Sequence, residues 1–307
     1  MPHLDAVDAT RLAEAFALMD EVADRVWPGW GRAPGDVLLV TAEAEFLFRT
    51  QAHPAGFTVT SVGPPLNGSA QERPRTFAPD FLATFPAFGG APTIVVGRAE
   101  ATGKRSTAWV LTVLHEHFHQ LQYSDPRYYA ETKALGLAGG DETGAWMLNY
   151  PFPYAATSAA FAALSRRLAD LVERPAPRER AAFWSDYASF AGALSPQDYR
   201  YLSLQLWQEG IARYVELRTA ETAARSRRVP GFYSSLLDYQ PYAEAAALLR
   251  SGVLKGLRGQ TMAADQRIVF YAFGAGLGLL LDQEKVDWRP RYLRDKFYLE
   301  KYRPPAR

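Results

Sequence analysis

The chain of 307 residues contains no cysteine, and this absence excludes disulfide bonds, thiolate metal ligands and cysteine nucleophiles. It also lacks a surplus of charge, because 34 Lys and Arg residues stand against 33 Asp and Glu residues, for a net charge of +1. Proteins that bind nucleic acid through bulk electrostatics need a strong positive surplus. We therefore do not expect nucleic acid as a partner.

Long hydrophobic runs are missing as well. The most apolar stretch, residues 268–281, is 14 residues long and includes three glycines, whereas a membrane-spanning helix needs about 20 apolar residues. The first residues carry acids at Asp5 and Asp8 and lack the apolar core of a signal peptide. We expect a soluble monomer without a membrane span, cytoplasmic by default and exported only if a leader was removed.

The composition of the chain, 48% hydrophobic and 22% charged, is that of a globular protein rather than a disordered or collagen-like one. Residues 4–26 have helical periodicity, and residues 36–110 contain short β-rich runs separated by Pro, Gly and Asn. The stretch 63–75 has the composition of a loop. From residue 106 onward, helical patterns cover 106–123, 155–173, 178–192, 197–228, 241–255 and 262–283.

These patterns predict an α+β fold. An N-terminal α/β portion with short strands, residues 1–105, precedes a mainly helical portion, residues 106–307, with a helix over about 110–123 at the junction.

The segment VLHEHFHQLQY holds three of the five histidines, and His115, Glu116 and His119 spell H-E-x-x-H. About 0.004 such matches are expected by chance in a chain of this composition. Helical positions four apart differ by about 40° in azimuth, so both imidazoles can reach one cation such as Zn²⁺. Glu116 is the natural general base for a water bound to that metal. His117 lies about 200° away from His115 and is expected to pack or hydrogen-bond.

The two remaining histidines, His3 and His53, have no motif around them and are interpreted as structural or surface residues.

A catalytic zinc, one per chain, needs a third protein ligand and one position for water. No further histidine-rich segment exists, so we look for a carboxylate, and Glu209 in LWQEGIARYVEL is the best candidate. Gly210 after it would let another backbone or the metal approach closely. Glu216, on the same helical face, is placed to hydrogen-bond a ligand histidine. Alternatively, Glu209 is a surface acid, with Glu216 or Glu221 in its place.

HEHFHQ together with WQEGIARYVE resembles the gluzincin metallopeptidases, which are thermolysin-like and aminopeptidase-N-like zinc enzymes. In the aminopeptidase-N-like branch, H-E-x-x-H-Q is followed by a W-x-x-E-G-x-A-x-Y-x-E helix whose first Glu is the third zinc ligand. The residues that match here are Trp207, one position nearer the Glu than in the family, and Glu209, Gly210, Ala212, Tyr214 and Glu216.

The family's Y-x-x-G element matches Tyr271-Ala-Phe-Gly274, 62 residues after Glu209. The resemblance implies that Tyr271 stabilises the oxyanion, although the residues alone suggest a core aromatic. The 90 residues between His119 and Glu209 exceed the gap in that branch, and a G-x-M-E-N segment is missing. The resemblance therefore implies the catalytic class and a zincin-like active-site helix, but not aminopeptidase specificity.

We thus predict a zinc metallopeptidase acting on a peptide or protein substrate. One alternative is a catalytically idle zincin-like protein that binds metal or a partner. Another is a helical structural protein in which the motif is accidental and no zinc is bound. The weaker signals in the sequence favour neither of these alternatives. The acids Asp125, Glu131, Asp141 and Glu142 are typical of solvated loops, and the GAGLG run at 274–278 is typical of close helix packing.

Overall fold

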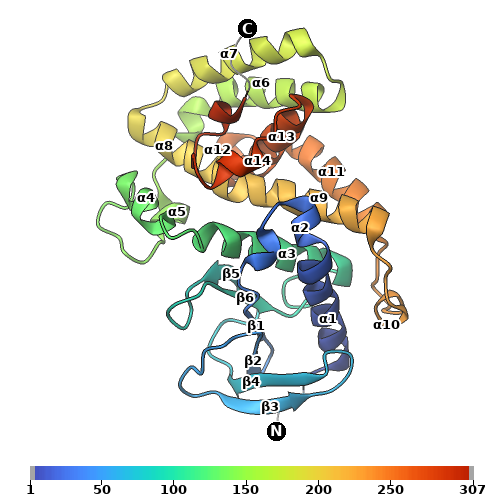
Figure 1. The fold of residues 1–307 in the computed structure, drawn as a ribbon. Coiled ribbons are helices and arrows are strands. Elements are labelled where there is room, and N and C mark those ends of the chain that lie inside the picture. Colours follow the sequence, from blue (N-terminus) through green and yellow to red (C-terminus); the bar gives the residue numbers. More distant parts are fainter. Residues whose placement is uncertain (1–3, 304–307) are drawn as a thin grey trace. The chain divides into compact units, whose positions relative to one another are not determined.

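The computed structural model describes residues 4–303, so the expectation for His3 lies outside the described residues. It has the predicted α+β fold (Figure 1). Contacts divide the chain into two compact units: unit 1 is Met1–Asp125 with Glu216–Ala247, and unit 2 is Pro126–Val215 with Leu248–Arg307.

Unit 1 is built on a six-stranded mixed sheet with the order β3-β4-β2-β1-β6-β5. Strands β1 and β6 pair in parallel, and the other neighbouring pairs are antiparallel. The strands are β1 (Val37–Val40), β2 (Ala44–Phe48), β3 (Thr58–Val62), β4 (Gly68–Pro74), β5 (Leu82–Phe85) and β6 (Thr93–Gly97).

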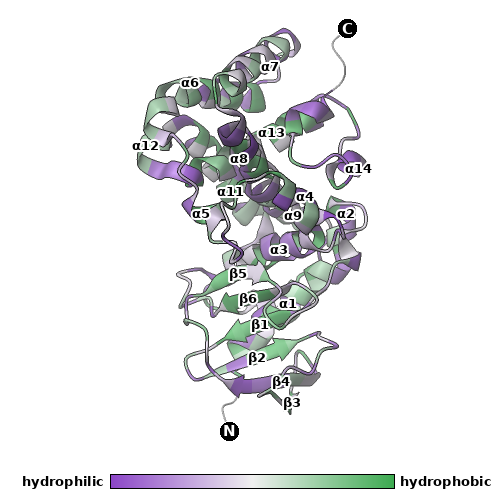
Figure 2. Ribbon diagram, turned by 90° about the vertical axis from the view of Figure 1, so that its left-hand side faces the viewer, coloured by the Kyte–Doolittle hydropathy of each residue, from purple (hydrophilic) through white to green (hydrophobic). Residues whose placement is uncertain are grey.

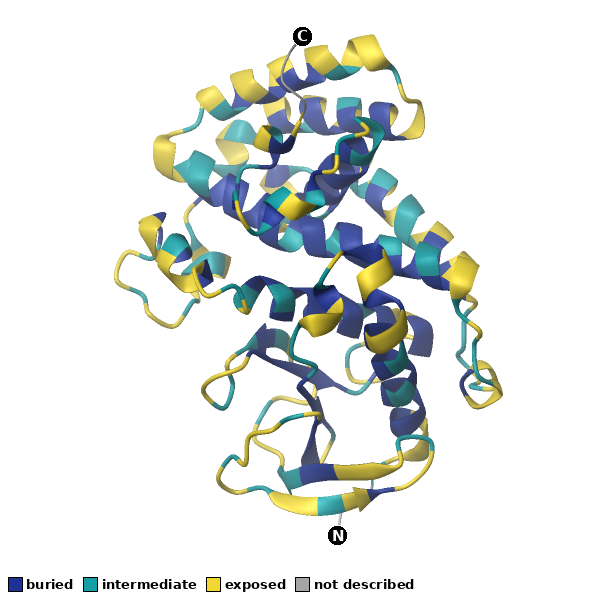
Figure 3. Ribbon diagram, viewed as in Figure 1, coloured by how far each residue is buried: buried dark blue, intermediate teal, exposed yellow. Residues whose placement is uncertain are grey.

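The middle of this sheet is the core of unit 1. Strands β1, β2 and β6 are buried along their whole length, whereas β3 is mostly exposed (Figure 3). Strands β1 and β6 are also mainly hydrophobic (Figure 2). Helix α3 (Ser106–Tyr123) packs against β5 and β6, and α1 (Ala6–Glu21) packs against α3. The shorter helices here are α2 (Ala23–Val26), η1 (Trp30–Arg32) and α10 (Gly231–Ser234).

A buried carboxylate on β2 binds the segment of chain that follows β4. Glu45 is fully buried and accepts hydrogen bonds from Arg73 Nε at 2.6 Å and from the backbone N–H groups of Thr76 and Phe77 at 2.7 and 2.6 Å. Burial by itself would raise the pKa of Glu45, but these donors outweigh it and hold the pKa below its usual value. The carboxylate is therefore ionised and satisfied inside the sheet.

Unit 2 is helical. Helix α13 (Val269–Gln283) is buried over most of its length and packs against α6 (Tyr154–Glu173) and the π-helical segment η2 (Leu206–Gly210). The other helices of unit 2 are α4 (Tyr128–Ala134), α5 (Trp146–Asn149), α7 (Pro177–Gly192), α8 (Pro196–Gln205), α12 (Met262–Asp265), η3 (Gln266–Ile268), α14 (Arg289–Tyr292) and η4 (Leu299–Tyr302). The boundaries between the units fall within α9 (Ile211–Ser226) and α11 (Tyr242–Gly259).

The predicted loop at 63–75 is wrong, because strand β4 occupies 68–74. The polar side chains of β4 give this segment the composition of a loop. In the structure they have partners: Gln71 donates to the Ala52 carbonyl, and Arg73 pairs with Glu45. Strand β4 lies between β2 and β3, so its backbone is hydrogen-bonded on both sides. The edge strand β5 was not predicted either.

The predicted helices are confirmed, with three interruptions. The helix expected over 4–26 divides into α1 and α2. The one expected over 197–228 contains η2 between α8 and α9, and the one expected over 262–283 breaks at Gln266, whose φ is +47°. Within the described residues, no helix combines the length and apolar character needed to cross a membrane.

Candidate metal centre

Helix α3 of unit 1 carries the H-E-x-x-H motif, and His115, Glu116 and His119 are all buried. The Trp109 indole N–H donates to the Gly97 carbonyl at the end of β6 at 2.8 Å, and the Gln120 amide donates to the carbonyls of Asp36 and Pro92. These bonds fix the helix on the strand ends at both of its halves. Because the helix cannot roll on the sheet, the direction of its histidine face is determined.

His115 and His119 lie one turn apart on that face, with ring centroids 4.9 Å apart. Glu216 Oε2 lies 3.3 Å from His115 Nδ1, and Gln122 Oε1 lies 2.6 Å from His119 Nδ1. When Nδ1 carries the proton and donates it to such an oxygen, the lone pair is on Nε2. The hydrogen bond to Gln122 sets up His119 as an Nε2 donor, and at His115 the Glu216 carboxylate lies at ion-pair distance from Nδ1 and favours the same arrangement.

Glu216 therefore contacts a histidine of the motif, as expected from its spacing. The reserve candidate Glu221 instead pairs with Arg218 at 2.6 Å. The contact from Gln122 was missed in the sequence, although the i, i+3 spacing from His119 on one helix face could have indicated it.

The acid of the motif, Glu116, is buried and contacts the edge strand of the sheet. The Thr84 hydroxyl on β5 lies 2.7 Å from Glu116 Oε2 and 3.1 Å from the Glu116 backbone carbonyl. The bond to Oε2 restrains one carboxylate oxygen, and the other, Oε1, remains for a different partner. No sequence pattern pointed to Thr84, which lies 32 residues earlier in the chain.

His117 points into the core instead. It is 1% exposed, and its ring stacks on that of Trp30 at 5.3 Å. Burial lowers the pKa of His117 to about 4, so the ring is neutral at physiological pH. The expectation that this histidine is a packing residue is confirmed.

Glu209 lies in η2, next to a close contact between two helices of unit 2. A Cβ atom on Gly210 would come within 2.4 Å of the Gly274 Cα atom on α13. Glycine is therefore required for the backbone approach that the sequence suggested, and Gly274 in the GAGLG run is its partner.

Tyr271 on α13 is electrostatically linked to Glu209. Burial raises the pKa of the Tyr271 phenol well above its usual value, and the Glu209 carboxylate raises it further. Arg267 Nη1 donates to the Tyr271 hydroxyl at 3.3 Å. The phenol is therefore a protonated donor, which fits the role that the resemblance implies.

His115, His119 and Glu209 form one group of possible metal ligands, because each offers one ligand atom and these atoms all lie within 4.8 Å of one another. Zinc takes nitrogen and oxygen ligands at about 2.0–2.2 Å, so the ligand atoms of a tetrahedral site are about 3.4 Å apart. Two histidines and one glutamate are also the donor set of catalytic zinc sites that keep a position for water.

The acids just beyond α3 have other partners. Glu131 pairs with Lys296 at 2.7 Å, Asp141 accepts from the backbone N–H groups of Thr143 and Trp146, and Glu142 is exposed. Asp141 and Glu142 thus lie in a loop, as the sequence suggested, whereas Glu131 differs from that expectation because it lies in helix α4 and pairs with a buried lysine.

No family model matches the chain, and neither a curated protein nor a solved structure matches it.

Proposed function

We propose that this chain is a zinc-dependent hydrolase, specifically a metallopeptidase that cleaves peptide bonds with a metal-activated water. The observation that carries the proposal is the group formed by His115, His119 and Glu209, with the buried acid Glu116 beside the first of them. The gluzincin-like motifs support the same assignment, since they contain the same residues in the same roles.

The two histidines would bind the ion through Nε2, because Glu216 and Gln122 engage their Nδ1 atoms. Held by these residues, a zinc ion would supply Lewis-acid chemistry, lowering the pKa of a bound water to about 7 and polarising the scissile carbonyl. Partners that orient the imidazoles keep the three donors converged and so limit the reorganisation that binding requires.

Glu116 would move the proton. Thr84 holds Oε2, so the attacking water gives its proton to Oε1, and the same oxygen later returns a proton to the leaving amine. The hydroxyl–carboxylate bond also fixes the direction of Oε1. A general base must be within hydrogen-bond reach of the proton that it takes.

Tyr271 would donate a hydrogen bond to the substrate carbonyl oxygen as negative charge develops on it. Its phenol keeps its proton at neutral pH because its pKa is raised, and Arg267 donates to the same oxygen, which strengthens the phenol as a donor. Losing one such donor typically costs about 10²–10³ in kcat.

Metal analysis and two variants test the proposal. The purified protein should contain one zinc per chain and hydrolyse members of a fluorogenic peptide library. Glu116→Gln should keep the zinc and lose hydrolysis, whereas His115→Ala should lose the zinc. Glu142→Gln, a change at an exposed acid, is the matched control and should behave as wild type.

Three results would contradict the proposal in different ways. An active Glu116→Gln protein would refute the role of the acid. Stoichiometric zinc without turnover of any peptide would support the alternative of a metal-binding protein without catalysis. A wild-type protein that binds no zinc would refute the metal centre itself.

A further inference from the structure

We infer that residues 289–302, here called the C-terminal clamp, hold the π-helical turn η2 in the geometry that presents Glu209, and that Tyr292 is the positioning residue. This inference rests on the proposed function, since it concerns the third ligand of the proposed zinc site. All the contacts that carry it lie within unit 2.

The turn that contains Glu209 lacks one hydrogen bond of a normal α-helix. The Ile211 N–H donates to the carbonyls of Leu206 and Gln208, five and three residues back. In an α-helix it would donate to Trp207, four residues back. The Trp207 carbonyl therefore does not receive the Ile211 N–H, and a donor from outside the turn can stabilise the π-helical geometry.

Tyr292 supplies that donor. Its hydroxyl lies 2.6 Å from the Trp207 carbonyl, and in return the Trp207 indole N–H donates to the Tyr292 carbonyl at 3.2 Å. The two rings stack with centroids 4.5 Å apart and an interplanar angle of 14°. Both side chains are fully buried. Two reciprocal hydrogen bonds and a stacked ring pair thus join Trp207 to Tyr292, where an α-helix would have a bond from the Ile211 N–H to the Trp207 carbonyl.

The clamp is itself tightly held. Phe297 adopts φ +76°, a left-handed conformation that is strained for a non-glycine residue, and its ring packs edge-on against Trp207 at 5.3 Å. Lys296, with a side chain 1% exposed, pairs with Glu131 at 2.7 Å. Tyr302 donates to the Asp295 carbonyl at 2.8 Å.

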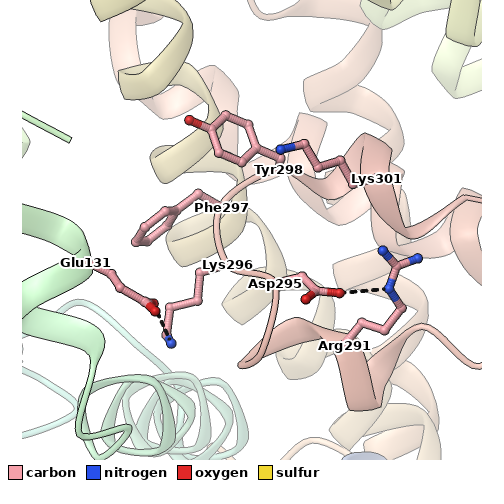
Figure 4. Close-up of a pocket in the computed structure, with 7 residues that line it drawn as sticks. All are labelled: Glu131, Arg291, Asp295, Lys296, Phe297, Tyr298 and Lys301. Carbon is pink, nitrogen blue, oxygen red and sulfur yellow. Dashed lines mark hydrogen bonds and ion pairs between the residues drawn. The ribbon is translucent and has the colours of Figure 1, made fainter. Parts of the chain in front are cut away.

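Figure 4 shows this part of the clamp where it lines a cavity of about 530 Å³. Lys296 reaches across to Glu131, and Asp295 faces Arg291, so the opposite charges along the cavity are paired. The strained backbone at Phe297 is retained because the surrounding contacts determine it. The paired residues that line the cavity therefore help to keep the clamp in this conformation.

The side of the turn that faces α13 cannot move inward either, because Gly210 and Gly274 are in backbone contact there. If the Trp207 carbonyl regained the Ile211 donor, the π turn would contract to an α turn. The side chains before and after it would then rotate relative to each other by up to about 100°, the angle of one helical residue. Such a rotation would turn Glu209 away from the direction that it now has.

The test is Tyr292→Phe, which keeps the stacked ring and removes only the hydroxyl that donates to Trp207. Tyr242→Phe is the control, since its hydroxyl donates to Glu14 at 2.8 Å and both residues belong to unit 1 rather than to the clamp or η2. Both variants lose one tyrosine hydroxyl bond, so their melting temperatures without metal should fall by similar small amounts.

The readouts are the Zn²⁺ dissociation constant, from competition with a chelating dye, and the absorption spectrum of the Co²⁺-loaded protein. We expect Tyr292→Phe to raise the dissociation constant on the order of 10-fold and to change the cobalt spectrum. Tyr242→Phe should leave both readouts at wild-type values.

Two outcomes would overturn the inference while the zinc site stands: wild-type zinc affinity in Tyr292→Phe, or an equal loss of affinity in Tyr242→Phe. A wild-type protein that binds no zinc would overturn the proposed function and the positioning role together. The wild-type titration therefore separates the two failures.

Discussion

The contact between Gly210 and Gly274 makes a sharp prediction about stability and metal binding together. In Gly210→Ala the new Cβ atom would lie 2.4 Å from Gly274 Cα and 3.0 Å from the Phe270 carbonyl oxygen. Carbon atoms pack at about 3.5–4.0 Å, so the two segments must separate by about 1 Å or more. Both obstructing groups are backbone atoms and cannot rotate away as a side chain could.

Overpacking of this kind typically costs about 1–3 kcal/mol, and backbone obstruction places Gly210→Ala near the upper end. A loss of about 3 kcal/mol corresponds to a fall in Tm of about 5–10 °C in a protein of this size. Because Glu209 is the adjacent residue, the same displacement should also weaken zinc binding. Calorimetry without metal and a zinc titration of the folded protein measure the two effects.

Gly252→Ala is the matched control. Gly252 is an exposed position inside helix α11, and a Cβ atom there would meet nothing within 4 Å. Alanine is favoured over glycine in helices by about 0.5–1 kcal/mol, so this variant should be slightly more stable than wild type. If Gly210→Ala were as stable as Gly252→Ala, the close backbone contact, and the reasoning built on it, would be refuted.

Three further predictions concern single contacts. Glu216→Gln should raise the zinc dissociation constant by about 10–100-fold, because the carboxylate 3.3 Å from His115 Nδ1 is lost; unchanged affinity in a dye competition would exclude this role. Thr84→Val should keep zinc and lower kcat on the order of 10-fold with little change in KM, because a donor to Glu116 is removed; a wild-type rate would count against it. The pKa of Glu45 is held below its usual value near 4.5, so its ionised form stabilises the fold above that pH and the benefit disappears as the pH falls through the lowered pKa. In urea unfolding, the stability advantage of wild type over Glu45→Gln should therefore shrink from about pH 6 to about pH 3, and an advantage independent of pH would contradict this account.

Much of the fold could be predicted because it is encoded locally. The helical and strand periods that place α3, α6 and β1 are visible within windows of 5 to 20 residues. The same holds for the histidine pair, since a spacing of four residues puts both rings on one helix face wherever that helix lies. His117 could be separated from them by the same geometry.

The rest depended on which segments meet in space. Strand β4 is polar and has no local signal, and it becomes a strand because β2 and β3 offer hydrogen bonds on both sides of it. Thr84 reaches Glu116 across 32 residues, and Tyr292 reaches Trp207 across 85. No periodicity connects such positions.

The sequence by itself determined the type of donors, two imidazoles and a set of candidate carboxylates, because residue identity and helical spacing are local properties. The tertiary structure decided which partners orient those donors and which turn carries Glu209, because hydrogen bonds between distant segments exist only after the chain has packed. The π-helical turn illustrates the difference. Its geometry depends on the hydroxyl of Tyr292, 85 residues after Trp207, and nothing in LWQEG predicts that partner.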